Sequence, residues 1–367
     1  MEIRIGDCRE LLRAMPDESV NCVVTSPPYW GLRDYGVVGQ IGMEATLAEH
    51  LQIMVEVFRE VRRVLRKDGT CWVNYGDCYA TTPNGRSAAD VKAAGNDDRT
   101  FRDKPFSTVQ GTMKPKDLCM VANRLAIALQ DDGWWVRSEI IWHKPNPMPE
   151  SIVDRPACQH EKVWLITRSQ KYAYDAAAVL QPASESTHAR VSQNVAAQVG
   201  SARANGGKKT NGNMKAVVRK QDGHGRRIAG FNARFDEKAR VVNSPKITEA
   251  GSGNKNNSSF IDAIALVVPE RNLRNVWTIP TAAFAEAHFA TFPPALVEPC
   301  IKAGCPAGGV VLDPFGGAGT VGLVADRLGR DAILFELNPE YAAIAERRIS
   351  ADAGMFGKIS KTISGAA

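Results

Sequence analysis

A short proline turn near the amino terminus is the first segment whose residues could do chemistry. Thr25-Ser26-Pro27-Pro28-Tyr29-Trp30 follows the apolar run 20–24, which predicts a buried β-strand. Two successive prolines stiffen the turn and remove two backbone donors, which leaves the Ser26 hydroxyl and the Pro27 carbonyl as acceptors. Such acceptors can bind the two protons of a substrate amino group and orient its lone pair. Tyr29, helped by Trp30, offers an aromatic face on which a base can stack.

A glycine-rich turn near the carboxyl terminus predicts a second binding element. Residues 310–320 read VVLDPFGGAGT, a predicted strand at 310–312 followed by glycines and a helix that ends near Gly329. Glycines let the backbone turn tightly and approach a ligand closely. Glu336 follows the next predicted strand, 332–335, and lies 17 residues after Gly319, where a carboxylate can bind ribose hydroxyls. The spacing differs from the G-x-G-x-x-G of nicotinamide dinucleotide sites, so we predict a different ligand with an adenosine-like ribose.

The segments between these motifs alternate between strand and helix patterns. Apolar residues recur at helical spacing from Leu47 to Leu65, Thr46 and Glu49 form a capping box, and Gly69 is expected to end this helix. Further helices are predicted at 116–132 and 339–349, and further strands at 71–74, 134–142 and 163–167. Residues 81–115, rich in Gly, Asn, Asp and Pro, predict a long loop. This alternation favours an α/β fold with a largely parallel sheet.

Positive charge is concentrated in one segment. Residues 181–260 hold 14 Lys and Arg against 5 Asp and Glu, a local net charge of +9, whereas the whole chain carries +6. A basic face of this kind suits a polyanion such as DNA, because phosphate contacts release counterions. A solvated loop with surplus lysines is the alternative. The predicted DNA-binding residues are Lys208, Lys209, Arg219, Lys220, Arg226 and Arg227.

Together the motifs resemble the β-class S-adenosylmethionine-dependent DNA amino-methyltransferases, also called the DNA methylase N-4/N-6 family. In this family the SPPY or DPPY tetrad precedes the DPFxGxG cofactor loop along the chain. Gly6-Asp7-Cys8 is similar to the family's early acidic motif, and residues 140–147 and 161–164 to its strand motifs around the target base. Residues 288–294 are similar to the segment that precedes the cofactor loop.

The resemblance implies a Rossmann-like methyltransferase fold with a mostly parallel sheet, a permuted motif order and an irregular, basic target-recognition insertion. It implies methyl transfer from S-adenosyl-L-methionine to the exocyclic amino group of a flipped base in double-stranded DNA, as in restriction–modification systems. Adenine N6 and cytosine N4 stay equally open, because both present a similar amino donor. Methylation at cytosine C5 is disfavoured, because it needs a thiolate and no Pro-Cys stands at a comparable strand end.

Carried over residue by residue, the resemblance gives two further sets of site residues. The expected catalytic residues are Ser26, Pro27, Pro28 and Tyr29. The expected cofactor-binding residues are Asp7, Cys8, Thr291, Phe292, Asp313, Phe315, Gly317, Gly319, Thr320, Glu336 and Asn338.

The expected division of the chain follows these motifs. Residues 1–180 form the catalytic half of the methyltransferase domain, 181–260 the target-recognition region, 261–350 the cofactor-binding half, and 351–367 a flexible tail. No metal is expected, because Cys158 and His160 lack a second pair of ligands. Without an apolar run long enough to span a bilayer, a cytoplasmic, nucleoid-associated protein is expected. The resemblance is compatible with a homodimer.

Two other functions compete with this interpretation. A sequence-specific DNA reader with weak turnover would keep the pocket but show little methylation. An RNA methyltransferase would use a similar tetrad, but in those enzymes the cofactor loop comes first in the chain. The intact tetrad argues against the reader, and the motif order argues against the RNA enzyme.

Overall fold

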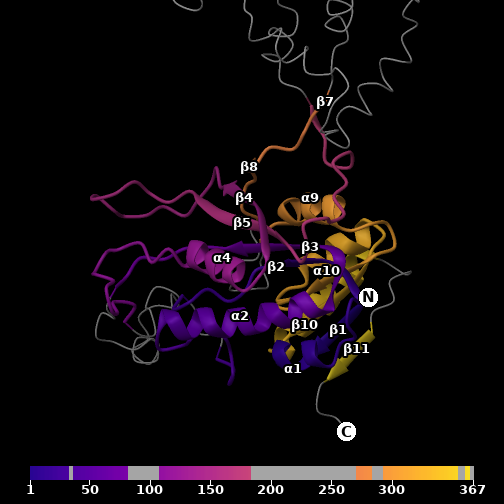
Figure 1. The fold of residues 1–367 in the computed structure, drawn as a ribbon, viewed down its shortest axis with the longest axis horizontal. Helices are drawn as coiled ribbons and strands as arrows, with labels where there is room; N and C mark the ends of the chain where they lie inside the picture. Colours follow the sequence, from indigo (N-terminus) through magenta and orange to yellow (C-terminus); the bar gives the residue numbers. More distant parts are fainter. Residues whose placement is uncertain (33–35, 82–106, 183–269, 283–291, 354–359, 364–367) are drawn as a thin grey trace, which may run out of the picture. The chain divides into compact units, whose positions relative to one another are not determined.

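Two compact units make up the chain, one formed by Met1–Val179 with Asn272–Ala367 and the other by Leu180–Arg271. The structure is a computed structural model and describes residues 1–32, 36–81, 107–182, 270–282, 292–353 and 360–363 (Figure 1). In the second unit the described residues form one short antiparallel pair, β6 (Gln181–Pro182) with β7 (Glu270–Arg271). The six basic residues predicted to bind DNA lie outside the described residues.

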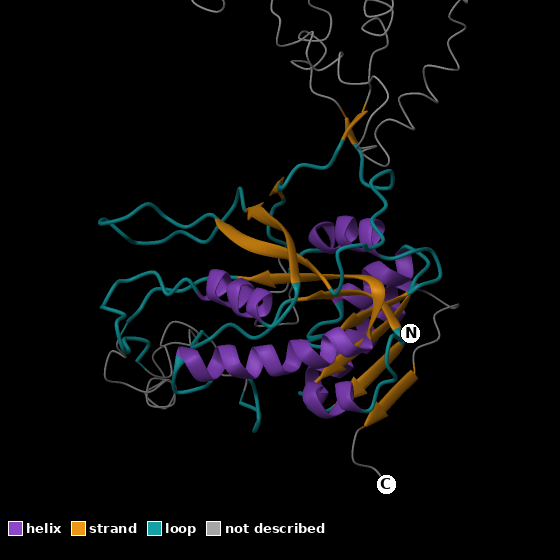
Figure 2. Cartoon of the chain, viewed as in Figure 1, coloured by secondary structure: helices purple, strands orange, loops and turns teal. Residues whose placement is uncertain are grey.

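A mostly parallel sheet is the framework of the first unit (Figure 2). Within the described residues it has nine strands in the order β11-β1-β10-β9-β2-β3-β5-β4-β8. The strands are β1 (Glu2–Ile5), β2 (Val20–Thr25), β3 (Leu65–Tyr75), β4 (Trp135–His143), β5 (His160–Thr167), β8 (Val276–Thr278), β9 (Val310–Asp313), β10 (Asp331–Glu336) and β11 (Ser360–Ile363). All neighbours pair in parallel except β5, which runs antiparallel to both β3 and β4. The α/β prediction with a largely parallel sheet is confirmed.

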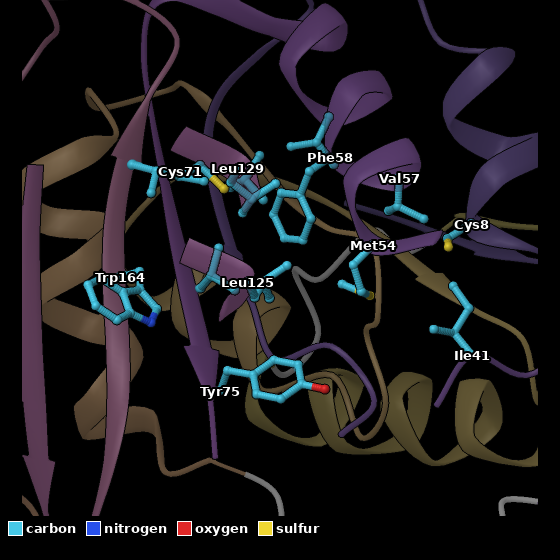
Figure 3. Close-up of a cluster of buried hydrophobic side chains, with 14 of the residues drawn as sticks. Cys8, Ile41, Met54, Val57, Phe58, Cys71, Tyr75, Leu125, Leu129 and Trp164 are labelled. Atoms are coloured by element: carbon cyan, nitrogen blue, oxygen red, sulfur yellow. The ribbon is translucent and has the colours of Figure 1, made fainter. Parts of the chain in front are cut away.

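Helices cover both faces of this sheet. The first set is α1 (Cys8–Arg13), α2 (Leu47–Val64) and α4 (Val121–Asp131), and the second is α9 (Pro294–Gly304), α10 (Thr320–Arg327) and α11 (Pro339–Ala353). Successive strand residues point to opposite faces, so Val23 joins the cluster under the first set while Cys22 and Val24 join the cluster under the second. In the first cluster Phe58 of α2 gathers with Leu125 and Leu129 of α4 (Figure 3).

The amino terminus of α2 has the predicted capping box. The Glu49 backbone N–H donates to Thr46 Oγ1 at 3.1 Å, and the Thr46 N–H donates to Glu49 Oε2 at 3.0 Å. The predicted end of this helix at Gly69 is wrong, because α2 ends at Val64 and Gly69 lies inside β3. A Cβ at Gly69 would lie 2.6 Å from the Leu65 side chain and 2.9 Å from the Asn21 carbonyl oxygen, so packing explains this glycine.

Two other predicted boundaries also differ from those in the structure. The helix expected from residue 116 begins at Val121, because Lys116 and Met120 adopt positive φ angles of 74° and 57°. Within the tail expected from residue 351, α11 extends to Ala353 and β11 pairs in parallel with β1. That pairing covers backbone groups which an edge strand would leave exposed. No helix in the described part of the chain is long and apolar enough to cross a membrane.

Candidate functional site

A pocket of about 320 Å³ lies at one edge of the sheet. Its lining comes from the carboxyl ends of β1, β2, β9 and β10, which parallel pairing brings to the same edge. Lys144, just after β4, and Glu161, near the start of β5, line it as well. Because β5 runs antiparallel to its neighbours, its first residues reach the edge where the other strands end.

The proline tetrad lies in this pocket and joins a polar network. The Tyr29 hydroxyl donates to Glu161 Oε2 at 2.8 Å, and Ser26 Oγ donates to the Tyr29 hydroxyl at 3.5 Å. Asn74 Nδ2 donates to the Tyr29 hydroxyl at 2.8 Å and to Glu161 Oε2 at 2.9 Å. The Lys144 ammonium pairs with Glu161 Oε1. Burial, and next the charge of Glu161, raise the pKa of Tyr29 well above its ordinary value, so the phenol stays protonated.

The aromatic residues of the turn differ in their surroundings. The Tyr29 ring packs against Tyr75 with centroids 4.7 Å apart, and a Cβ at Gly76 would lie 2.6 Å from the Tyr29 ring. Trp30 is 1% exposed, and its indole N–H donates to the Glu44 carbonyl oxygen at 3.0 Å. The expected help from Trp30 in stacking a base is therefore wrong, because this side chain belongs to the core.

A second, buried network supports the tetrad from behind. The Tyr75 hydroxyl donates to the Pro28 carbonyl oxygen at 3.2 Å and accepts the Trp30 backbone N–H at 2.9 Å. His50 Nε2 lies 2.7 Å from the same hydroxyl, and His50 Nδ1 donates to Glu44 Oε2 at 2.8 Å. The backbone of the proline turn is thus anchored to α2 and β3.

The glycine loop is held to the strand beside it by Glu336. This carboxylate accepts the Gly317 N–H through Oε2 and the Asn338 N–H through Oε1, each at 2.8 Å. Burial raises its pKa. Glu336 also lines the pocket, so one side chain both shapes the loop and faces the ligand space.

Asp313 and Gly319 lie beneath the pocket and not in its lining. Asp313 is 1% exposed, and its Oδ1 accepts the Thr25 hydroxyl at 2.7 Å and the Phe315 N–H at 3.1 Å. Burial raises the pKa of Asp313 to about 7. Gly319 has a φ of 75°, and a Cβ there would lie 2.8 Å from the Cβ of Ala345 in α11. Both residues therefore fix the position of the loop.

Asp7 lines the pocket and caps α1. Its carboxylate accepts the Arg9 N–H at 2.8 Å and pairs with the Arg9 guanidinium. Burial raises the pKa of Asp7, but the hydrogen bonds and charge of Arg9 together outweigh it and lower the pKa below its ordinary value. The neighbouring Cys8 also lines the pocket, and burial raises the pKa of its thiol to about 12. At neutral pH this corner holds a carboxylate and a protonated thiol.

Most of the other predicted residues gather in the same pocket. The lining includes Pro27, Pro28, Phe292, Phe315, Gly317, Thr320 and Asn338. Thr291 lies outside the described residues. Among the residues that the structure describes, no group of three or more His, Cys, Asp or Glu is placed to hold a metal.

The predicted site did not include Lys144, Glu161 and Asn74, which line the pocket and belong to the polar network around Tyr29. Lys144 and Glu161 belong to segments that resemble the family's strand motifs, but the hairpin of β4 and β5 is needed to bring them together. Asn74 was detectable as a polar residue inside an apolar strand. Its Oδ1 is buried and has no hydrogen-bond partner within the described residues. A buried acceptor of this kind gains by binding a donor from a ligand.

Comparison with known proteins gives one consistent result. A family model described as DNA methylase matches residues 20–347. The type II methyltransferase M.XycI of Xanthomonas campestris pv. cyanopsidis is 40% identical over 94% of this chain and 86% of its own length.

Solved structures share the fold as well, and two of them are described as methylases or methyltransferases of DNA. An inferred DNA modification methylase from Thermus thermophilus, complexed with S-adenosyl-L-methionine, matches with a TM-score of 0.51 and 20% identity over 100% of this chain and 99% of its own. The PvuII DNA methyltransferase, described as cytosine-N4-specific, matches with a TM-score of 0.52 and 18% identity over 98% of this chain and 94% of its own.

The pKa of Asp313 predicts a pH-dependent stability. Its folded value is about 7 against an ordinary 3.8, so between these values the folded protein holds a proton that the unfolded chain has lost. This bound proton stabilises the folded protein fully below the pKa of the unfolded chain. The stabilisation is lost as pH rises toward the folded pKa, by up to about 1.4 kcal/mol per pH unit. In urea titrations from pH 4 to 8, the free energy of unfolding of Asp313→Asn should decline less steeply with pH than that of the wild type. The asparagine does not titrate, and its Oδ1 can accept both hydrogen bonds. Parallel declines would contradict this assignment.

Proposed function

The chain belongs to the DNA methylase family of N6 and N4 methyltransferases, and we propose that its pocket performs direct methyl transfer to one flipped base. It is an S-adenosyl-L-methionine-dependent enzyme that acts on DNA. The observation that supports our assignment of the pocket is the meeting of the two motifs. Thr25, just before the tetrad, donates to Asp313, at the start of the glycine loop, across 288 residues of sequence.

The residues around the pocket fit the cofactor. Asp7 and Glu336 place two carboxylates near the ends of β1 and β10, where ribose hydroxyls and an adenine amino group would find acceptors. Phe315 and Phe335 add apolar lining beside the glycine loop. When bound, the cofactor supplies a methyl group on a positively charged sulfur. We assign its binding to Asp7, Cys8, Thr291, Phe292, Asp313, Phe315, Gly317, Gly319, Thr320, Glu336 and Asn338, with Asp313 and Gly319 acting from below.

The tetrad is proposed to hold the amino group of the base. Ser26 Oγ and the Pro27 carbonyl would accept its two protons, which makes the nitrogen more tetrahedral and turns its lone pair toward the methyl group. Pro28 stiffens the turn, and the Tyr29 ring is proposed to contact the flipped base. Asn74 Oδ1, buried and unpaired among the described residues, supports this role because it offers one more acceptor.

Both amino-bearing bases fit this chemistry, so the proposed substrate is adenine N6 or cytosine N4. Neither the reader nor the RNA enzyme gains support from the comparisons, in which the family model and both solved structures are described as DNA methylases or methyltransferases.

DNA contacts are proposed for the basic segment 181–260, the target-recognition region. Its charge is the supporting observation, since phosphate contacts by Lys208, Lys209, Arg219, Lys220, Arg226 and Arg227 would strengthen binding to any duplex. Residues 1–180 and 261–350 are then the catalytic and cofactor-binding halves of the methyltransferase domain. A homodimer, and action in the cytoplasm on nucleoid DNA, are proposed on the family resemblance alone.

Methylation of DNA in cells tests the proposed reaction. A plasmid replicated in cells that express this protein should gain N6-methyladenine or N4-methylcytosine, detected by nuclease digestion and mass spectrometry. Ser26→Ala should lose most of the mark and keep its cofactor affinity, because the lost acceptor acts on the amino group. Ser19→Ala is the matched control, since its hydroxyl donates to the Pro16 carbonyl oxygen in a turn outside the pocket. Absence of both marks from plasmid made with the folded, cofactor-binding wild type would refute the proposed function.

Cofactor affinity tests the role of Glu336. Hydrogen bonds to a charged group are worth about 1.5–3 kcal/mol, so Glu336→Gln should raise the cofactor dissociation constant roughly tenfold to hundredfold. Isothermal titration calorimetry measures this constant directly. Glu340→Gln, an exposed carboxylate in the first turn of α11, should bind cofactor like the wild type. Equal affinities for the two variants would remove Glu336 from the cofactor site.

The salt dependence of DNA binding tests the basic segment. Duplex affinity, measured by fluorescence anisotropy between 50 and 200 mM salt, should fall steeply, on the order of 10³-fold or more for six phosphate contacts. Replacing all six basic residues with glutamine should flatten the plot of log K against log salt, with cofactor affinity as the control for folding. A slope that does not change would show that these residues make no phosphate contacts.

A further inference from the structure

A chain of hydrogen bonds with a single direction leads from the tetrad to Glu161. Ser26 Oγ donates to the Tyr29 hydroxyl, which donates to Glu161 Oε2. A carboxylate can only accept, so the chain ends there. The Asn74 amide supports this order, because its Nδ2 also donates to Glu161 Oε2, at 2.9 Å, which fixes the amide with nitrogen toward the carboxylate.

Methylation of an amino group must release a proton. The bond from nitrogen to the methyl carbon forms while the carbon–sulfur bond breaks, and the electron pair of that bond neutralises the positive sulfur. The nitrogen then carries the positive charge until one of its protons leaves. Ser26 can take that proton only by giving up its own, because a hydroxyl carries one hydrogen.

We propose that Glu161 is the final acceptor of this proton, reached through Ser26 and Tyr29. This inference rests on the proposed function of the pocket. One proton passes from the amino nitrogen to Ser26 Oγ, the proton of Ser26 passes to the Tyr29 oxygen, and the proton of Tyr29 passes to Glu161 Oε2. The methylated base, Ser26 and Tyr29 end neutral, and Glu161 ends protonated. Its side chain is 18% exposed, which allows it to return the proton to water.

The surroundings of Glu161 suit an ionised acceptor. Lys144 pairs with Oε1 and lies 4.4 Å from the centre of the Trp142 ring, so a positive charge is fixed beside the carboxylate. The raised pKa of Tyr29 keeps this phenol protonated, as a relay requires. Asn74, on β3, is neutral. The remaining ionisable groups near the start of β5 pair elsewhere or across the hairpin: Lys162 with Glu139, and His160 opposite His143.

The experiment measures single-turnover methylation by preformed complexes of enzyme, cofactor and duplex DNA across pH 4 to 9. Glu161→Gln keeps the shape of the side chain but cannot serve as a carboxylate base. Its rate constant should fall on the order of a hundredfold, the lower range for general base catalysis, and the acid limb of the wild-type pH profile should disappear. Cofactor and DNA dissociation constants should stay unchanged.

Two further variants make the test specific. Tyr29→Phe keeps the ring and removes the relay hydroxyl, so it should lower the rate and remove the acid limb as Glu161→Gln does. The double variant should be no slower than either single variant, because both act on one path. Glu139→Gln is the matched control, a carboxylate of the same hairpin paired with Lys162 outside the pocket, and should match the wild type.

The outcomes separate the inference from the proposed function. If the wild type leaves no methyl mark, the proposed function is refuted. A wild type that methylates while Glu161→Gln keeps its rate and acid limb overturns the role of Glu161. If the methylation rate falls in Glu161→Gln but stays normal in Tyr29→Phe, the relay through Tyr29 is overturned. Should Glu161→Gln not fold, the pH profile of Tyr29→Phe decides, since an intact acid limb there overturns the proposal.

Discussion

The side-by-side pairing of β2 and β9 is the constraint on which the site depends. These strands come from opposite ends of the chain, yet Cys22 lies opposite Val311 and Val23 opposite Leu312 in parallel register. Parallel pairing forces the turn after β2 and the loop after β9 to the same edge of the sheet. The buried hydrogen bond from Thr25 to Asp313 then fixes their relative height. The pocket that we propose to hold both cofactor and substrate follows from this one junction.

The antiparallel strand β5 adds a carboxylate to the pocket that a parallel strand in its place would put at the opposite edge of the sheet. Its reversed direction places Glu161 at the edge where β2 and β3 end, opposite Trp142 in the hairpin. The strand itself therefore brings the carboxylate into contact with Tyr29 and Asn74, and no loop is needed to carry it there. Positioning from strands is more rigid than positioning from loops, which suits groups that must keep hydrogen-bond distances.

Short sequence motifs were enough to predict the parts of the site whose residues lie close together along the chain. The tetrad, the glycine loop and Glu336 each follow a strand that periodicity reveals, and the capping box of α2 is a four-residue signal. The role of Glu161 depends on the register of the β4–β5 hairpin, which no short motif encodes. Trp30 was misplaced because an aromatic residue beside a site looks the same in sequence whether it faces ligand or core. The pairing of β11 with β1 was not predicted, because backbone hydrogen bonds hold these two strands together and such bonds leave no side-chain motif in the sequence.

The junction of β2 and β9 also affects how the protein is made. A ribosome delivers β2 long before β9, since 288 residues separate Thr25 from Asp313. Until then one edge of the apolar β2 has no partner, and unpaired edges of this kind invite aggregation. Contacts so distant in sequence close slowly. A nascent chain therefore cannot form the pocket before almost all of it has been translated, so incomplete chains have no complete active site.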